Sequence, residues 1–182
     1  MRKLLFLTVA VCLFSIVGLA QDKKADYSGT WTLDVSKSKL DERSRIESQT
    51  LTVTQTDKEI KVATATKRLP TPADAPQGGG RPGGGGGMGG GDSRRTYALD
   101  GKETTIEQET PRGNVPVKLT AKSDAGKLHL ASSRTMNTQM GEMTMTTKET
   151  WELSADGKTL TVNRESTSPR GTNSSTMVFA KK

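Results

Sequence analysis

Several residue types that build cross-links and active sites are nearly absent from this sequence of 182 residues. It has one cysteine, Cys12, and one histidine, His129, and aromatic residues make up only 4% of it. A disulfide and a metal site of the Cys/His type are therefore excluded. A Ser/His/Asp triad would need His129, which strand alternation predicts to face outward. We expect no enzymatic activity, no bound metal and no cofactor.

The chain has no long apolar run except at its beginning. Arg2 and Lys3 precede an uncharged stretch from Leu4 to Val17, and small residues follow at Gly18 and Ala20. This pattern is typical of a secretory signal peptide, residues 1–20, cleaved after about Ala20. Since Cys12 lies inside the leader, the mature chain has no thiol. We expect a bacterial protein of the periplasm or the medium.

The mature chain carries an excess of positive charge. Removing residues 1–20 leaves 162 of the 182 residues, and the 27 basic residues fall to 25 against 20 acidic ones, a net charge of about +5. Residues 21–182 have the length of one domain, which we expect to be monomeric. The charge allows weak contact with an anionic membrane or polymer. Export and the lack of aromatic residues among basic clusters argue against nucleic acid.

Alternation of apolar and polar residues with a period of two dominates the rest of the chain. It predicts half-buried β-strands joined by short turns such as Asp100-Gly101 and Asp156-Gly157. A meander this long curls and closes, so the predicted fold is all-β: a single antiparallel up-and-down barrel of about 8–10 strands. Residues 36–46 have room for one helical turn. The predicted strands are 29–35, 48–56, 59–67, 94–99, 103–109, 115–122, 127–135, 142–153, 158–167 and 174–181.

Residues 69–93 interrupt this pattern with four prolines and eleven of the chain's 19 glycines. Such a segment has few side chains to bury, so it predicts a disordered, flexible loop within the barrel domain. A phosphate-binding loop would need a Gly-Lys-Ser/Thr ending and a following helix, and neither is present.

Alternation also predicts which residues face the interior. At one end the inward residues are large and apolar, with Trp31 and Trp151 forming a closed-end core. Toward the end with the glycine-rich loop the inward residues turn polar. A buried guanidinium needs a counter-ion, water or a bound anion, so the candidate ligand-binding residues are Arg95, Arg134, Arg164, Gln108 and Glu149. A register slip of one residue would instead place the arginines outside, in solvent.

The start of the first strand supports a family resemblance. Gly29-Thr30-Trp31 resembles the Gly-x-Trp signature of lipocalins and the wider calycin group. The stretches Ser28–Leu33 and Asp156–Val162 also resemble small uncharacterised bacterial exported proteins. The lipocalin resemblance implies that Trp31 lies at the closed end of the barrel and that a basic residue, for which Arg164 is the candidate, packs across its ring. It also implies transport or storage of a small, largely apolar molecule.

Two functions follow as hypotheses, with a minor third. The first is a non-catalytic binding protein that holds a small acidic or lipidic ligand in the barrel. The acid group of the ligand would contact the arginines, and its apolar part would lie toward the tryptophan end. The second is an envelope or surface module with a filled barrel and a basic exterior. Methionines 136, 140, 143 and 145 also form a soft-ligand cluster that would suit Cu(I), although methionine commonly fills gaps in a core.

Overall fold

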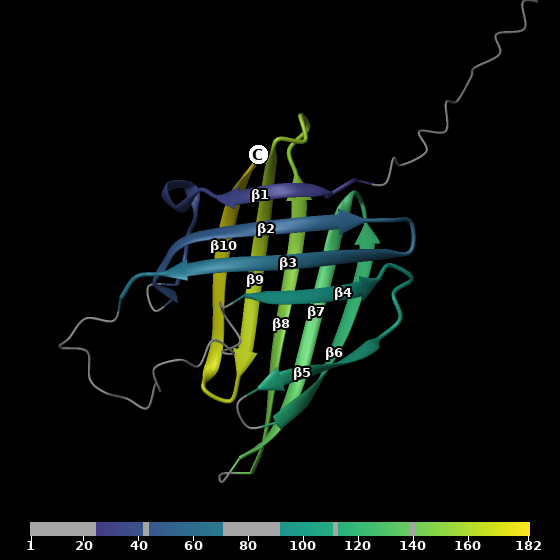
Figure 1. Cartoon of the computed structure of the whole chain (residues 1–182), viewed down its shortest axis with the longest axis vertical. Helices are drawn as coiled ribbons and strands as arrows, with labels where there is room; N and C mark the ends of the chain where they lie inside the picture. Colours follow the sequence, from purple (N-terminus) through teal and green to yellow (C-terminus); the bar gives the residue numbers. More distant parts are fainter. Residues whose placement is uncertain (1–24, 42–43, 71–91, 111–112, 139–140) are drawn as a thin grey trace, which may run out of the picture.

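The computed structural model describes residues 25–41, 44–70, 92–110, 113–138 and 141–182. The predicted leader, Met140 and most of the glycine-rich segment lie outside these residues. The described chain forms ten antiparallel strands and one short 3-10 helix (Figure 1). The elements are β1 (Gly29–Leu33), η1 (Val35–Lys37), β2 (Ile46–Gln55), β3 (Glu59–Arg68), β4 (Ser93–Ala98), β5 (Thr104–Thr110), β6 (Gly113–Asp124), β7 (Lys127–Thr138), β8 (Gly141–Leu153), β9 (Thr159–Ser168) and β10 (Gly171–Lys181).

The strands form one sheet in the order β4-β3-β2-β1-β10-β9-β8-β7-β6-β5. Consecutive strands are neighbours except for β4 and β5, and the first strand, β1, pairs with the last, β10. In Figure 1 strands β1–β4 lie across strands β6–β10, so the sheet folds over on itself. No ladder joins β4 to β5 among the described residues, which makes the barrel nearly closed. The predicted all-β, antiparallel up-and-down meander barrel is therefore confirmed.

Alternation correctly placed the apolar core. Trp31 and Trp151 are 0% and 1% exposed, and the aliphatic residues predicted beside them are buried or packed against the core. Tyr27, which precedes β1, completes this end: its ring meets Trp151 edge-on at 6.0 Å, and its carbonyl accepts a hydrogen bond from Trp31 Nε1 at 2.9 Å. Burial of these side chains is the main stabilising contribution. The buried hydrophobic residues are Tyr27, Trp31, Leu33, Ile46, Leu51, Val53, Ile60, Val62, Tyr97, Val117, Leu119, Ala121, Leu128, Leu130, Trp151, Leu160, Val162, Met177 and Phe179.

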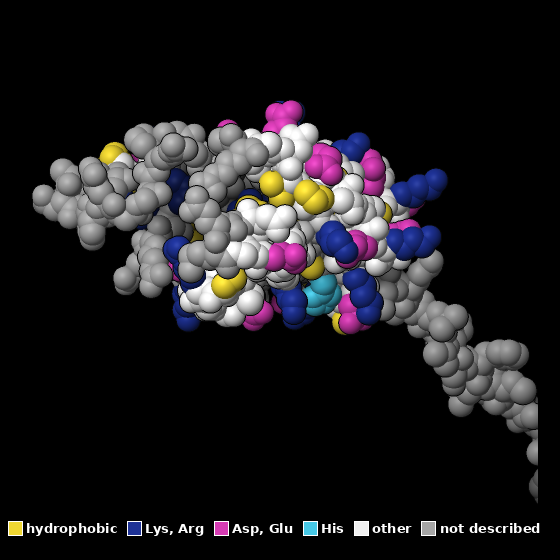
Figure 2. All heavy atoms as spheres, turned by 90° about the horizontal axis from the view of Figure 1, so that it is seen from below, with side chains coloured by type: hydrophobic (Ala, Val, Ile, Leu, Met, Phe, Trp, Pro, Cys, Tyr) yellow, Lys and Arg dark blue, Asp and Glu magenta, His cyan; other side chains and the backbone are white. Residues whose placement is uncertain are grey.

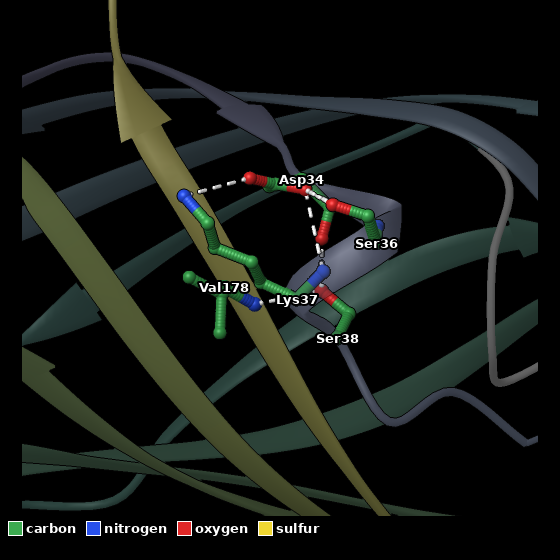
Figure 3. Close-up of polar contacts among 5 residues, drawn as sticks. All are labelled: Asp34, Ser36, Lys37, Ser38 and Val178. Atoms are coloured by element: carbon green, nitrogen blue, oxygen red, sulfur yellow. Dashed lines mark hydrogen bonds and ion pairs between the residues drawn. The ribbon is translucent and has the colours of Figure 1, made fainter.

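A capped corner after β1 joins the first strand to the last (Figure 3). Asp34 Oδ1 accepts hydrogen bonds from the Ser36 and Lys37 amides at 3.1 and 3.3 Å, which starts the 3-10 helix. Ser38 Oγ donates to the Asp34 carbonyl at 2.6 Å and accepts from the Val178 amide at 2.9 Å. The Asp34 amide donates to the Val178 carbonyl at 2.8 Å. The single helical turn expected within residues 36–46 thus begins one residue earlier and fixes the β1–β10 closure.

Candidate functional site

The three predicted arginines face the interior, on strands whose neighbouring positions face solvent. Arg95 is half-buried while Arg94 is exposed, and Arg164 is half-buried between exposed residues. Arg134 is 8% exposed, and the inward hydroxyls of Ser132 and Thr147 are buried as well. The polar half of the interior is therefore present where alternation predicted it, and the register slip that would place the arginines outside is not observed.

Glu149 and Arg164 form a buried ion pair on neighbouring strands. Arg164 Nε donates to Glu149 Oε1 at 2.8 Å, and Arg164 Nη2 lies 2.7 Å from the same oxygen. The other carboxylate oxygen accepts a hydrogen bond from Trp151 Nε1 at 2.8 Å. The register pairs Glu149 with Arg164 directly across the β8–β9 ladder. Of the three alternatives for a buried guanidinium, a counter-ion is present for Arg164, and it is Glu149.

The surroundings of Glu149 favour its ionised form. Burial acts to raise its pKa, but the charge and hydrogen bond of Arg164, the indole of Trp151 and the charge of Arg95 together hold the pKa below its ordinary value. Both carboxylate oxygens accept hydrogen bonds, one from Arg164 and the other from Trp151, so Glu149 neutralises Arg164.

Arg95 and Arg134 form a second basic group in the same half of the interior. Arg95 Nη1 reaches Ser132 Oγ at 3.5 Å, from β4 to the non-adjacent strand β7. Arg134 Nη2 lies 3.9 Å from Met145 Sδ on β8. Burial lowers the pKa of Arg134, and the charge of Arg95 lowers it further. The positive charge of Arg95 thus disfavours the charged form of Arg134.

Tyr97 lies on the inward face of β4, two residues from Arg95. Burial raises the pKa of its hydroxyl, and the negative charge of Glu149 raises it further, while Arg95 acts in the opposite direction. The phenol is therefore neutral near pH 7 and remains a hydrogen-bonding group in the cluster. Sequence analysis did not single it out, although its inward position follows from the same alternation as that of Arg95.

Gln108 is the one predicted site residue that the structure sets apart. It is half-buried on β5, opposite Val115 of β6, and within the described chain it makes no hydrogen bond to the four charged residues. The structure therefore brings together Arg95, Arg134, Arg164 and Glu149. We call these four residues the interior charge cluster.

The contact predicted between Arg164 and Trp31 is wrong. Lys181 of β10 lies over the Trp31 ring instead, with Nζ 5.1 Å from the ring centroid, while Arg164 is committed to Glu149. The reason is register, because the β1–β10 ladder pairs Trp31 with Lys181 directly. The ammonium group of Lys181 therefore makes a cation–π contact with the Trp31 ring.

The methionines and the histidine were the other candidates. Met136 and Met143 are directly opposite on the β7–β8 ladder, and Met145 continues the same face. His129 faces outward, as predicted, where its Nδ1 is 3.2 Å from Thr150 Oγ1. No group of three or more His, Cys, Asp or Glu side chains suited to a metal ion occurs in the described ranges. Across those same ranges, no helix has the length and apolar character needed to span a membrane.

Charges of both signs are mixed on the exterior. Figure 2 shows Lys and Arg interspersed with Asp and Glu on one face of the barrel. Six ion pairs among the described residues have well-exposed lysines, for example Lys118 with Glu103 at 2.9 Å and Lys127 with Glu152 at 2.9 Å. Exposed pairs of this kind contribute little to stability. On this face the lysines are not gathered into a single basic patch.

No protein-family model matches the chain, and no curated protein matches it by sequence. Solved structures resemble it in fold. One is zebrafish ileal bile acid-binding protein complexed with cholic acid, with 14% identity, a TM-score of 0.48, and coverage of 86% of this chain and 98% of that one. Another is human cRBP IV, with 14% identity, a TM-score of 0.48, and coverage of 87% and 99%. At this identity the likeness concerns the barrel and assigns neither a ligand nor a residue role.

Proposed function

We propose that this protein is an exported, non-catalytic binding protein that holds a small amphipathic anion inside its barrel. The acid group of the ligand lies between Arg95 and Arg134, and its apolar part contacts the neighbouring aliphatic and methionine side chains. The observation that carries this proposal is the inward position of both Arg95 and Arg134 in the polar half of the interior, where the charge of Arg95 acts on Arg134.

The charge of the cluster supports an anionic ligand. Its four members carry three positive charges and one negative charge, and Glu149 uses both oxygens on Arg164 and Trp151. An acid group between Arg95 and Arg134 relieves their mutual repulsion and accepts their planar donors. Met145, beside Arg134, supplies an adaptable apolar contact at the same place.

The first test is native mass spectrometry of the protein purified gently from its own source. A mass that lacks residues 1–20 and carries a small acidic or lipidic molecule is the expected result. The mass of the chain also tests export, since the leader is retained if it is not a signal peptide. A bare protein would favour the alternative of a filled barrel acting through its surface.

The second test measures the charge requirement directly. Dodecanoate and dodecanol share a chain but differ in their head group, so titration calorimetry should show binding of the acid and much weaker binding of the alcohol. In the double variant Arg95→Gln/Arg134→Gln the affinity for dodecanoate should fall at least about tenfold, since hydrogen bonds to charged groups contribute about 1.5–3 kcal/mol each.

Arg94→Gln provides the matched control, because Arg94 is the outward neighbour of Arg95 on the same strand. It removes one positive charge from the exterior and none from the interior, so dodecanoate affinity should be unchanged. Equal losses in the double variant and in this control, or equal binding of acid and alcohol, would contradict the proposed site.

A further inference from the structure

Gln49 is a buried side chain in the interior whose polar group is incompletely satisfied. It is 1% exposed on β2, and its Nε2 donates to Thr66 Oγ1 of β3 at 2.9 Å. Its Oε1 is buried and receives no hydrogen bond from the described residues. Buried polar atoms of this kind are rare in native proteins, and a bound molecule is one way in which such an atom is satisfied.

The identity of the missing partner follows from the chemistry of the amide. If the amide is turned end for end, Oε1 accepts from the Thr66 hydroxyl and Nε2 becomes the group without a partner. One orientation therefore needs a donor and the other needs an acceptor. A hydroxyl group satisfies either orientation, because it both donates and accepts.

The strand register gives the distance of Gln49 from Arg95, which belongs to the interior charge cluster. Gln49 pairs with Thr66 on β3, whereas Arg95 pairs with Val62 on the same strand, four residues away. With about 3.3 Å per residue along a strand and about 4.8 Å between strands, the Cα atoms of Gln49 and Arg95 are about 16 Å apart. A ligand that is held by the arginines and extends along β3 reaches Gln49 at its distal end.

We infer that the ligand carries a hydroxyl group at the end remote from its acid, and that Gln49 binds this hydroxyl. The inference rests on the proposed function and narrows its ligand from amphipathic anions in general to hydroxylated ones. Other inward hydroxyls fit such a ligand: Thr147 Oγ1 lies 3.4 Å from Ser166 Oγ, and Ser132 accepts from Arg95. Gln49 is then a specificity-determining residue.

The test compares dodecanoate with its terminally hydroxylated analogue by titration calorimetry on the mature protein. The wild-type protein should bind the hydroxylated acid at least about fivefold more tightly, since an additional satisfied hydrogen bond has an effect of this order. In Gln49→Met, which keeps the volume and removes the amide, the preference should disappear while dodecanoate binding is retained. Ser48→Ala, at the exposed neighbouring position of β2, should preserve the preference.

The outcomes separate this inference from the proposed function. Equal wild-type affinity for the two acids, or a preference that survives Gln49→Met, overturns the role of Gln49 and leaves the anion site standing. Absence of binding by both acids overturns the proposed function together with the inference. Should Gln49→Met fail to fold, as judged by circular dichroism, Thr66→Val tests the same group. Loss of its hydroxyl frees Gln49 and should alter the preference without abolishing dodecanoate binding.

Discussion

Glu149 is the residue on which the packing of the interior charges depends most directly. Its carboxylate joins Arg164 to the indole of Trp151, and the side chains of Glu149 and Arg164 are only 12% and 20% exposed. Removing one partner of a buried ion pair leaves the other charge uncompensated, which costs more than the pair itself contributes. We therefore expect Glu149→Gln to lower the free energy of unfolding by about 3 kcal/mol, measured by urea denaturation.

Two further variants distinguish this mechanism from a general sensitivity of the region. Glu165→Gln removes an exposed carboxylate beside Arg164 and should change the stability by less than about 0.5 kcal/mol. Glu149→Met/Arg164→Met removes both charges and should recover much of the loss. If the double variant is less stable than Glu149→Gln alone, the ion pair is not the cause.

The same carboxylate predicts a pH dependence. Its folded-state pKa lies below the ordinary value, so its contribution is fully present above the ordinary pKa of a glutamate. The contribution is lost as the pH falls through the lowered value in the folded protein. The stability difference between the wild-type protein and Glu149→Gln should therefore shrink below about pH 4. A difference that stays constant down to pH 2 would contradict the assignment.

At the scale of the element, the start of β1 depends on a glycine for a backbone reason. Gly29 has φ +135°, which L side chains rarely adopt, and a Cβ built there would lie 2.8 Å from Lys181 Cε. The lysine can move, but the backbone cannot relax without breaking the β1 ladders. We expect Gly29→Ala to destabilise the barrel by about 1–3 kcal/mol, measured by thermal and urea unfolding.

Gly101 supplies the comparison for this prediction. It has φ +78° in the β4–β5 turn, and a Cβ there would meet nothing within 4 Å. Gly101→Ala should cost about 1 kcal/mol, less than Gly29→Ala. Lys181→Met in the Gly29→Ala background separates the two causes: substantial recovery would mean that contact with the lysine, and not backbone strain, is responsible.

Elements were predicted more successfully than the contacts between them. Alternation predicts where a strand lies and which of its residues face the interior. Arg95, Arg134 and Arg164 each lie two or four residues from a buried residue of the same strand, so each is predicted to face inward. These buried residues are Tyr97, Leu130 and Val162. Register between strands distant in sequence has no such signal. The lipocalin resemblance implied Arg164 as the partner of Trp31, whereas the β1–β10 ladder brings Lys181 there.

Tyr27 and Gln49 were missed for different reasons. Tyr27 precedes the first strand in a segment without alternation, and only the closed barrel brings its hydroxyl to the carbonyl of Trp151 at 3.1 Å. Gln49 is a polar residue at an inward position, and the alternation of apolar and polar residues gives no indication that it faces the interior. Its importance lies in a missing hydrogen bond, which a sequence cannot display.

At the scale of the whole molecule, the two tyrosines link alkaline pH to global unfolding. They are the only tyrosines in the chain, and both are buried. Burial raises the pKa of Tyr27 to about 12, and burial together with Glu149 raises that of Tyr97. A phenol with a raised pKa contributes stability that is complete below its unfolded value near 10 and is lost as the pH rises through its folded value.

Tyrosinate should therefore be absent from the folded protein at about pH 10 and appear cooperatively with the loss of near-ultraviolet circular dichroism at higher pH. Tyr27→Phe retains Tyr97 and should make the alkaline loss of stability shallower, although it also deletes the hydroxyl contacts to Trp151 and Gly126. Gradual ionisation of both tyrosines near pH 10 with the dichroism intact would mean that the closed end admits water. Because Trp151 contacts both Tyr27 and Glu149, such an opening would extend to the interior charge cluster, and both should be lost in the same unfolding transition.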